Sequence, residues 1–256
     1  MKNKIALIYS PKTSLQHLES IERLQDILND RILYSVCSKD LKELNEKETD
    51  LVLTVGGDGT FIRTSSFLRE TPILGINSEP NGSEGALTTL TADNLNELEK
   101  IIDEEKMLLR DRAIITRNGI QMPELALNEV YIGAASQFHT SRYKIRFKNK
   151  EEEQRSSGVI VCSGSGSHAW YKSAGGKPFN YDSKEFKFLV REHFFGKLFK
   201  PKILKGVIKE NETISFKSKS YYGGAIAVDS NKMYKFKFDE VIEISLSKEP
   251  LNVVVK

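Results

Sequence analysis

The sequence predicts a two-part protein, with an α/β first part built on a parallel sheet and a β-rich second part. Up to about residue 109, apolar segments of strand length alternate with segments whose apolar residues recur every three or four positions. This alternation is typical of a parallel sheet covered by helices. Beyond residue 110, short segments alternate apolar and polar residues, as antiparallel strands with one solvated face do. A chain of 256 residues is long enough for two modest domains.

The first part alternates strands and helices from its beginning. An apolar stripe at Leu15, Leu18, Ile21, Leu24 and Leu28 predicts a helix that Thr13 or Ser14 caps. A second helix is expected through residues 61–68, and a third, capped helix over residues 91–105. Strands are expected at residues 4–9, 32–36, 51–55 and 72–77.

The second part predicts short antiparallel strands. Clear examples are residues 144–147, 158–162, 213–216 and 234–238, in which apolar side chains are frequent or alternate with polar ones. The closing segments 241–246 and 251–255 are apolar enough to pack against a core.

Composition excludes several classes of protein. Hydrophobic residues make up 39% and charged residues 29%, which is typical of a folded chain, and no apolar run approaches the roughly 18 residues of a membrane span. Cys37 and Cys162 are too few for a disulfide scaffold or a four-cysteine zinc site. We interpret both as free thiols in a reducing compartment. The beginning of the chain lacks a signal-peptide pattern, so a cytoplasmic location and no membrane partner are expected.

Charge is unevenly distributed along the chain. Residues 1–109 contain 12 Lys and Arg against 19 Asp and Glu, whereas residues 110–256 contain 26 against 16. The basic second part either faces an anionic ligand or presents a lysine-rich solvated surface. No nucleic-acid-binding motif is present, so no nucleic-acid partner is expected.

Residues 56–60, which we call the glycine loop, read Gly56-Gly-Asp-Gly-Thr60 between a predicted strand and a predicted helix. Glycines let backbone amides approach a ligand closely, and a helix N-terminus attracts phosphate. Asp58 is expected on an exposed part of this loop, where it accepts a proton from a substrate hydroxyl or binds magnesium. The alternative is an Asp-Gly turn that only links strand to helix. The spacing matches neither the Walker A nor the dinucleotide fingerprint.

Two further polar segments follow predicted strands or begin them. Residues 77–86 form a Gly/Asn/Ser loop at the same expected sheet edge as the glycine loop. Asn128 and Glu129 begin an otherwise apolar strand, where the amide suits a base edge and the carboxylate suits a ribose diol. The alternatives are an ordinary loop and a polar strand entrance.

The fourth segment, residues 155–176, runs from a strand into a Gly/Ser loop and a predicted helix start. Its small residues 163–167 allow a flat ring or a phosphate to lie against the backbone, and Ser165 and Ser167 add hydroxyls. Trp170 either stacks on a base or fills the core. His168 has no second ligand at metal-binding spacing, so no protein-bound metal is expected.

Taken together and in this order, the glycine loop, Asn128-Glu129 and residues 158–176 resemble the NAD kinase family. That family transfers the γ-phosphate of ATP to the adenosine-ribose 2′-hydroxyl of NAD to make NADP. The resemblance covers about residues 5–255. It implies an α/β domain over 1–109, a β-rich NAD-binding domain over 110–239, and a tail over about 240–256 that packs back on the first domain.

The resemblance also implies a role for each matching residue. Asp58 would accept the proton of the ribose hydroxyl, Asn128 would recognise adenine and Glu129 would hold the ribose hydroxyls. The phosphate loop would consist of Gly56, Gly57, Gly59 and Thr60. The remaining NAD contacts would come from Arg63, Arg155, Ser165, Gly166, Ser167, His168, Ala169, Trp170 and Ser173.

The sequence departs from the usual bacterial pattern of this family. Ser157 stands where an aspartate is usual, and Gly164 and His168 also differ; the segments around them are most similar to the mitochondrial-type branch. These departures leave open whether NAD or NADH is the acceptor. The resemblance further implies magnesium held mainly by the ATP phosphates and a homodimer or homotetramer. A lipid kinase of the diacylglycerol/sphingosine kinase superfamily, which shares Gly-Gly-Asp-Gly, and a non-catalytic nucleotide-binding protein are the alternatives.

Overall fold

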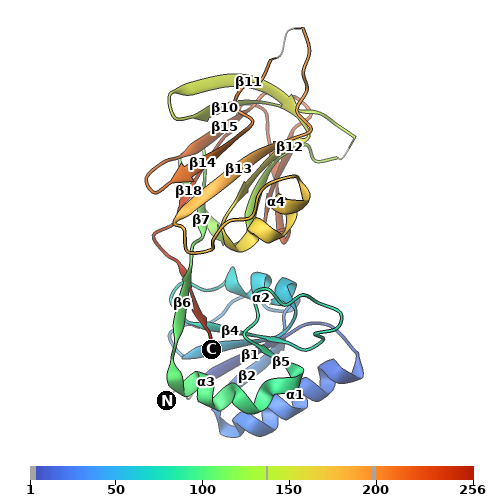
Figure 1. Ribbon diagram of the computed structural model, residues 1–256, viewed down its shortest axis with the longest axis vertical. Helices are drawn as coiled ribbons and strands as arrows, with labels where there is room; N and C mark the ends of the chain where they lie inside the picture. The colour runs from blue at the N-terminus through green and yellow to red at the C-terminus, as the bar shows by residue number, and fades with distance from the viewer. Residues whose placement is uncertain (1–3, 137, 198–199) are drawn as a thin grey trace. The chain divides into compact units, whose positions relative to one another are not determined.

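The computed structural model describes residues 4–136, 138–197 and 200–256 and divides the chain into two compact units (Figure 1). The first unit consists of the described residues up to Arg110 together with residues 249–256, and the second unit is Asp111–Lys248. The first unit is α/β with a mainly parallel sheet, and the second is β-rich. The fold class predicted from the sequence is therefore confirmed.

The first unit is an α/β domain, and β3 lies in the interior of its sheet. Its elements are β1 (Ile5–Tyr9), α1 (Leu15–Leu28), η1 (Asn29–Arg31), β2 (Ile32–Cys37), β3 (Leu51–Gly56), α2 (Asp58–Ser65), β4 (Ile73–Asn77), β5 (Leu90–Thr91), η2 (Ala92–Glu97), α3 (Leu98–Glu104), β6 (Met107–Arg110) and β19 (Leu251–Val254), where η marks a 3-10 helix. Within the described residues the strand order is β2-β1-β3-β4-β19-β6, with β5 beside β4. The strands β1 to β5 pair in parallel, and β19 pairs in parallel with β4 and antiparallel with β6.

Different helices cover the two faces of this sheet (Figure 1). Leu24 of α1 and Ile101 of α3 share one buried cluster with alternate strand residues such as Leu53. The other face carries α2, because a Cβ atom at Gly75 would come within 2.9 Å of the Phe61 ring. Because β1, β3 and β4 pair in parallel, the connections that follow these strands leave the same edge of the sheet.

The buried face of α1 differs from the predicted stripe. Leu15 is 73% exposed and Leu18 is 44% exposed, whereas His17 and Ser20 are buried together with the leucines at 24 and 28. The helix turns this face inward because the His17 ring finds hydrogen-bond partners inside the unit.

The predicted helix over residues 91–105 is broken near its beginning. Asn94 has non-helical torsion angles (φ −121°, ψ 30°), so a 3-10 helix precedes α3. The Thr91 amide donates to the Asn94 side chain at 2.7 Å, and this bond is half of a capping box that begins the 3-10 helix after Thr91.

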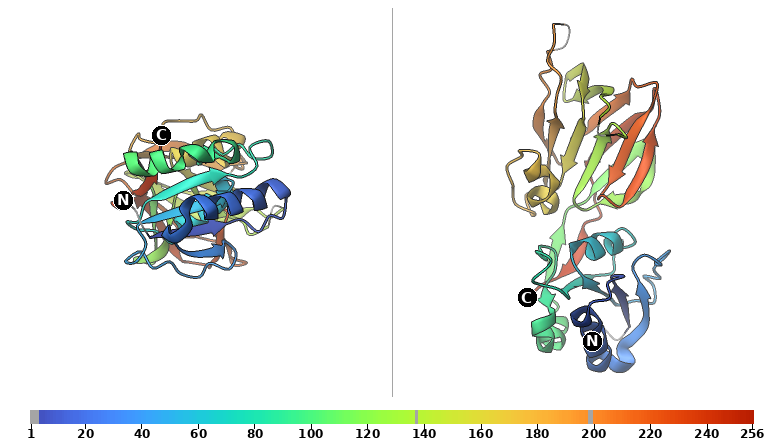
Figure 2. Two further views of the ribbon diagram at one scale, coloured as in Figure 1. Left: turned by 90° about the horizontal axis from the view of Figure 1, so that it is seen from below. Right: turned by 90° about the vertical axis from the view of Figure 1, so that its right-hand side faces the viewer.

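The second unit is a sandwich of two antiparallel sheets (Figure 2). Its elements are β7 (Ala113–Arg117), β8 (Ile120–Ala126), β9 (Glu129–Gly133), β10 (Ser141–Phe147), β11 (Lys150–Ser156), β12 (Gly158–Cys162), η3 (Ser165–His168), α4 (Trp170–Ser173), β13 (Glu185–Arg191), β14 (Lys205–Lys209), β15 (Ile214–Ser218), β16 (Gly224–Val228), β17 (Lys232–Phe236) and β18 (Val241–Leu246). In the described residues the sheet orders are β11-β10-β15-β18-β7-β8 and β14-β13-β12-β9-β16-β17. Side chains from both sheets form one core cluster.

The segment that returns to the first unit is shorter than the expected tail over 240–256. β18 pairs with β15 and β7 of the second unit, and its Ile242 and Ile244 are fully buried there. Of the expected tail, only residues 249–256 belong to the first unit. Buried and partly buried side chains alternate along β18, as in an antiparallel sheet, and β19 is the strand of the tail that joins the sheet of the first unit.

Among the described residues, no helix combines the length and the apolar character needed to cross a membrane.

Candidate active site

The glycine loop connects the end of β3 to the beginning of α2. A Cβ atom at Gly56 would come within 2.6 Å of the Thr60 hydroxyl oxygen, and one at Gly57 would come within 2.5 Å of the Ser83 hydroxyl oxygen. A Cβ atom at Gly59 would meet no atom within 4 Å. Two glycines therefore allow close packing, and the third leaves the first turn of α2 open on its outer side.

Asp58 lies in the first turn of α2 rather than on an exposed loop. Its half-buried carboxylate accepts hydrogen bonds from the amides of Leu87 at 2.8 Å and Ala86 at 3.1 Å. A carboxylate at this position also suits the positive end of the helix dipole. Each oxygen keeps a free lone-pair direction, so the group can still accept a proton or contact a substrate hydroxyl. Arg63 is exposed in the last turn of the same helix.

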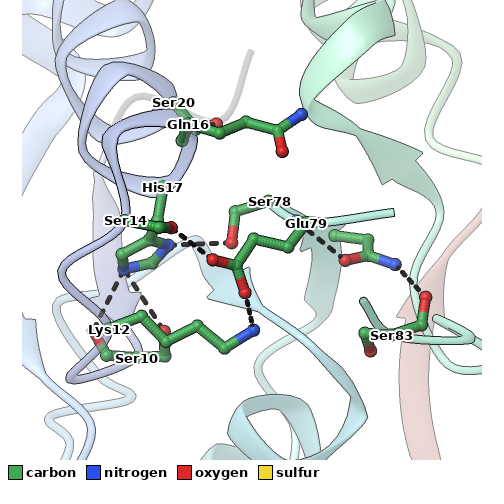
Figure 3. Close-up of polar contacts among 10 residues, drawn as sticks. Ser10, Lys12, Ser14, Gln16, His17, Ser20, Ser78, Glu79 and Ser83 are labelled. Carbon is green, nitrogen blue, oxygen red and sulfur yellow. Dashed lines mark hydrogen bonds and ion pairs between the residues drawn. The ribbon is translucent and has the colours of Figure 1, made fainter. Parts of the chain in front are cut away.

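The loops after β1 and β4 carry a polar cluster beside the glycine loop, which sequence reasoning did not predict (Figure 3). His17 is fully buried, with Nδ1 2.8 Å from the Ser78 hydroxyl and Nε2 3.0 Å from the Ser10 carbonyl. Burial lowers the pKa of His17 despite opposing effects of Ser10 and Glu79. Nearby, Glu79 pairs with Lys12 and accepts a hydrogen bond from Ser14. The sequence carries no local signal for this cluster, because the apolar stripe predicted for α1 does not include His17.

In the second unit, Asn128 directly precedes β9 and Glu129 begins it. A buried carboxylate holds this strand entrance in place. Asp229 accepts hydrogen bonds from the amides of Leu127, Asn128 and Glu129 at 2.7, 2.7 and 3.0 Å. Burial raises the pKa of Asp229 to about 6, although the three amides and Arg112 oppose this effect. Sequence reasoning missed Asp229, which lies 101 residues beyond Asn128.

The side chains of Asn128 and Glu129 retain unused acceptors. Both residues are buried, and Oδ1 of Asn128 and Oε2 of Glu129 have no hydrogen-bond partner. The other Glu129 oxygen accepts a hydrogen bond from Ser230 at 3.3 Å. Burial and the Asp229 charge raise the pKa of Glu129 to about 7, against the effect of Ser230. Buried acceptors without partners are destabilising by themselves, so this pair is suited to receive the donors of a ligand.

The Gly/Ser loop after β12 packs against the same strand entrance. The Ser163 amide donates to the Asn128 carbonyl at 2.9 Å, and a Cβ atom at Gly166 would come within 2.4 Å of that carbonyl oxygen. Ser167 is anchored by its hydroxyl, which donates to the Phe179 carbonyl at 3.0 Å. The structure therefore brings the segment containing Ser165, Gly166 and Ser167 together with Asn128.

The helical turn after this loop presents the remaining predicted contacts. His168, Ala169 and Ser173 are exposed, and Ser165 is half-buried. Trp170 is half-buried and stacks on Tyr131, with ring centroids 5.2 Å apart and an interplanar angle of 30°. Trp170 therefore packs partly as a core residue while one portion of its ring remains in contact with solvent.

Arg155 lies apart from the other predicted site residues of the second unit. It belongs to β11, in the sheet that does not contain β9. β12 begins two residues after β11, and its first residue, Gly158, pairs with Gly133, the last residue of β9. Glu129 is the first residue of β9, and the four residue steps between it and Gly133 span about 13 Å along the strand. Arg155 instead lines a cavity of about 320 Å³ together with Arg142, Lys219 and Tyr221.

No group of three or more His, Cys, Asp and Glu side chains that could hold a metal ion occurs among the residues that the structure describes. The glycine loop contains a single carboxylate, Asp58, and both of its oxygens already accept amide hydrogen bonds. One such carboxylate fits a nucleotide that brings its own magnesium on its phosphate oxygens.

Comparisons with known sequences place these motifs in a family. Residues 7–106 match the ATP-NAD kinase N-terminal domain. A probable NADH kinase from Oryza sativa subsp. japonica is 29% identical over 232 residues, which is 81% of this chain and 71% of the relative. An NAD kinase from Photorhabdus laumondii subsp. laumondii is 30% identical over 222 residues, which is 81% of this chain and 72% of the relative.

Solved structures share the fold. An NAD kinase from Archaeoglobus fulgidus, crystallised with ATP, has a TM-score of 0.76 and 23% identity, and the match covers 98% of this chain and 93% of the other. Yeast NADH kinase, complexed with NADH, has a TM-score of 0.80 and 16% identity, with 100% and 84% covered. The sequence relatives and the order of the motifs confirm the predicted resemblance, and the chain belongs to the NAD kinase family.

Proposed function

We propose that this chain is an ATP-dependent NAD kinase that phosphorylates the adenosine-ribose 2′-hydroxyl of NAD or NADH. The observation that carries the proposal is the buried pair of unpartnered acceptors, Asn128 Oδ1 and Glu129 Oε2. An adenosine supplies donors of matching kind, namely an exocyclic amine and ribose hydroxyls. Family membership supports the same reaction, and none of the relatives described above is a lipid kinase.

The proposed roles follow the two units. In the first unit, Gly56, Gly57, Gly59 and Thr60 hold the ATP phosphates at the beginning of α2. In the second unit, Asn128 binds adenine and Glu129 binds the ribose hydroxyls, with the Ser165–Ser167 segment, His168, Ala169, Trp170 and Ser173 completing the pocket. Arg63 and Arg155 are assigned to the outer NAD contacts, although Arg155 belongs to the sheet of the second unit that does not contain β9.

The proposed chemical step is a direct phosphoryl transfer. The ribose 2′-oxygen forms a bond to the γ-phosphorus of ATP while the bond from that phosphorus to the bridging oxygen breaks, and ADP leaves. Asp58 accepts the proton of the 2′-hydroxyl. Its two amide donors fix the direction of the carboxylate, and most of the acceleration comes from positioning and charge stabilisation. Magnesium would stay on the ATP phosphates and neutralise their charge.

The decisive test is NADP formation by the purified chain with magnesium, ATP and either NAD or NADH. The wild type should form NADP or NADPH, and the Asp58→Asn variant should lose about 10²- to 10⁴-fold in rate, the range for a general base. The matched control is Asp93→Asn, an exposed change in the first turn of η2, which should not alter the rate. Absence of product from folded wild-type protein with both acceptors would overturn the proposal. Lipid phosphorylation or tight NAD binding without turnover would then identify the alternative.

We also propose a homodimer or homotetramer that acts in the cytoplasm. Both cysteines are buried and free, as is usual in a reducing compartment. In the second unit, Phe138, Tyr221 and Tyr222 are 85%, 82% and 98% exposed and line a cavity of about 680 Å³. Exposed aromatic clusters of this kind favour association. Light scattering should give the mass of an oligomer, and Tyr222→Ser should shift it towards the monomer; a monomeric wild type would contradict this assignment.

A further inference from the structure

Among the loops that flank the glycine loop, only the one after β1 carries a cation. The strand order places β1 and β4 on either side of β3, so residues 10–14 and residues 78–89 are the neighbouring connections. Residues 78–89 contain Glu79 and Glu84 but no Lys or Arg, whereas residues 10–14 contain Lys12. A bound triphosphate carries several negative charges that cationic side chains stabilise.

Lys12 is engaged by an acidic residue of the opposite loop (Figure 3). Its amine forms an ion pair with one oxygen of Glu79, and the other oxygen accepts a hydrogen bond from Ser14. Ser14 is the N-cap residue of α1, yet its side chain makes no capping bond to the helix. The Lys12 and Glu79 side chains are 37% and 22% exposed. An ion pair this exposed contributes little to stability, so a phosphate can replace the carboxylate at small cost.

A separate, buried set of contacts holds the same two loops. Because the Ser10 carbonyl only accepts, His17 Nε2 carries the proton and Nδ1 accepts from the Ser78 hydroxyl. The backbones on both sides are tied to β3, since the Ser10 amide donates to the Val55 carbonyl and the Ser78 amide donates to the Gly56 carbonyl. The loops therefore keep their places when the ion pair between Lys12 and Glu79 opens.

We propose that Lys12 is a phosphate-binding residue of the nucleotide site, held by Glu79 in the empty protein and transferred to the ATP phosphates on binding. The inference rests on the proposed ATP-dependent function and adds a residue that the sequence motifs do not include. Opening of the ion pair requires no rearrangement of the loops, because the His17 contacts remain.

The test is ATP affinity, measured by calorimetry without NAD so that no turnover occurs. Lys12→Gln should weaken ATP binding about 10-fold, as expected for the loss of a charged hydrogen bond, and should leave adenosine binding unchanged. Glu79→Gln should tighten ATP binding, because it removes the competing carboxylate. The matched control is Lys42→Gln, the same charge change at an exposed position after β2, which should have no effect.

The opposite signs at positions 12 and 79 separate phosphate binding from a structural contact. If the pair only joins the loops, both variants should weaken ATP binding and lower the melting temperature together, which would overturn the inference. Unchanged ATP affinity in Lys12→Gln would also overturn it, and unchanged affinity in Glu79→Gln would reject the exchange with Glu79. NADP formation by the wild type is measured in a separate assay. Failure of the proposed NAD kinase function can therefore be told apart from failure of the inference about Lys12.

Discussion

The two units hold their predicted functional carboxylates in different ways. In the first unit, each oxygen of the half-buried Asp58 accepts a backbone amide from the segment after β4. In the second unit, Glu129 is 5% exposed, one of its oxygens has no partner, and burial raises its pKa to about 7. Asp58 is therefore part of what stabilises its unit, whereas Glu129 destabilises its own unit until a ligand arrives. Stability and function should respond together at position 58 and in opposite directions at position 129.

The largest expected difference comes from truncating both side chains. Asp58→Ala leaves two amides without an acceptor and should lower the free energy of unfolding by about 1–3 kcal/mol. Glu129→Ala should weaken NAD binding by about 1–3 kcal/mol without destabilising the free protein. Thermal denaturation measures the first effect, and quenching of the single tryptophan, Trp170, measures NAD binding. An equal loss of stability in both variants would contradict the difference between Asp58, which stabilises its unit, and Glu129, which does not.

A pair of glycine substitutions sharpens the same contrast. Gly166→Ala places a Cβ atom 2.4 Å from the Asn128 carbonyl oxygen, and such overpacking should destabilise the second unit by about 1–3 kcal/mol. Gly59→Ala meets no atom within 4 Å and lies inside α2, so it should stabilise the free protein by up to about 1 kcal/mol. ATP binding should nevertheless fall in Gly59→Ala, because the added methyl group lies where phosphate approaches. Unfolding curves and calorimetry decide both points.

The raised pKa of Glu129 predicts that the stability of the second unit depends on pH. Between its unfolded value near 4.5 and its folded value near 7, the folded state binds the proton and the unfolded state does not. Stability should therefore fall as pH rises through this window. Glu129→Gln removes this contribution, so its gain in melting temperature over the wild type should be larger at pH 8 than at pH 5. A constant difference would contradict the assignment.

The smallest effect is expected at Trp170. Trp170→Phe keeps an aromatic ring on Tyr131, so NAD affinity should change by less than about 1.5 kcal/mol, the upper range for an aromatic contact. Since this variant lacks tryptophan, calorimetry replaces fluorescence. A loss of NAD affinity larger than about 1.5 kcal/mol would contradict this expectation.

Local sequence patterns predicted much of the fold and part of the candidate site. The glycine loop was found because a strand, three glycines and a helix follow one another within a few residues. Asp229 and His17 were missed because their partners lie 100 and 61 residues away, and no local period encodes such contacts. The stripe of α1 was wrong at Leu15 and Leu18 for the same reason, since buried polar partners rotate the helix.

The place of β19 in the first sheet has a consequence for the order of events during synthesis. β19 lies between β4 and β6, so the sheet formed by the first 110 residues lacks an interior strand until residues 251–254 have been made. The second unit is continuous from Asp111 to Lys248 and can fold while that strand is still missing. Translation therefore completes the later unit before the earlier one, the reverse of the usual N-terminal-first order. Until then, β6 and the beginning of β4, which β5 does not cover, present unpaired edges that a chaperone or another nascent chain can occupy.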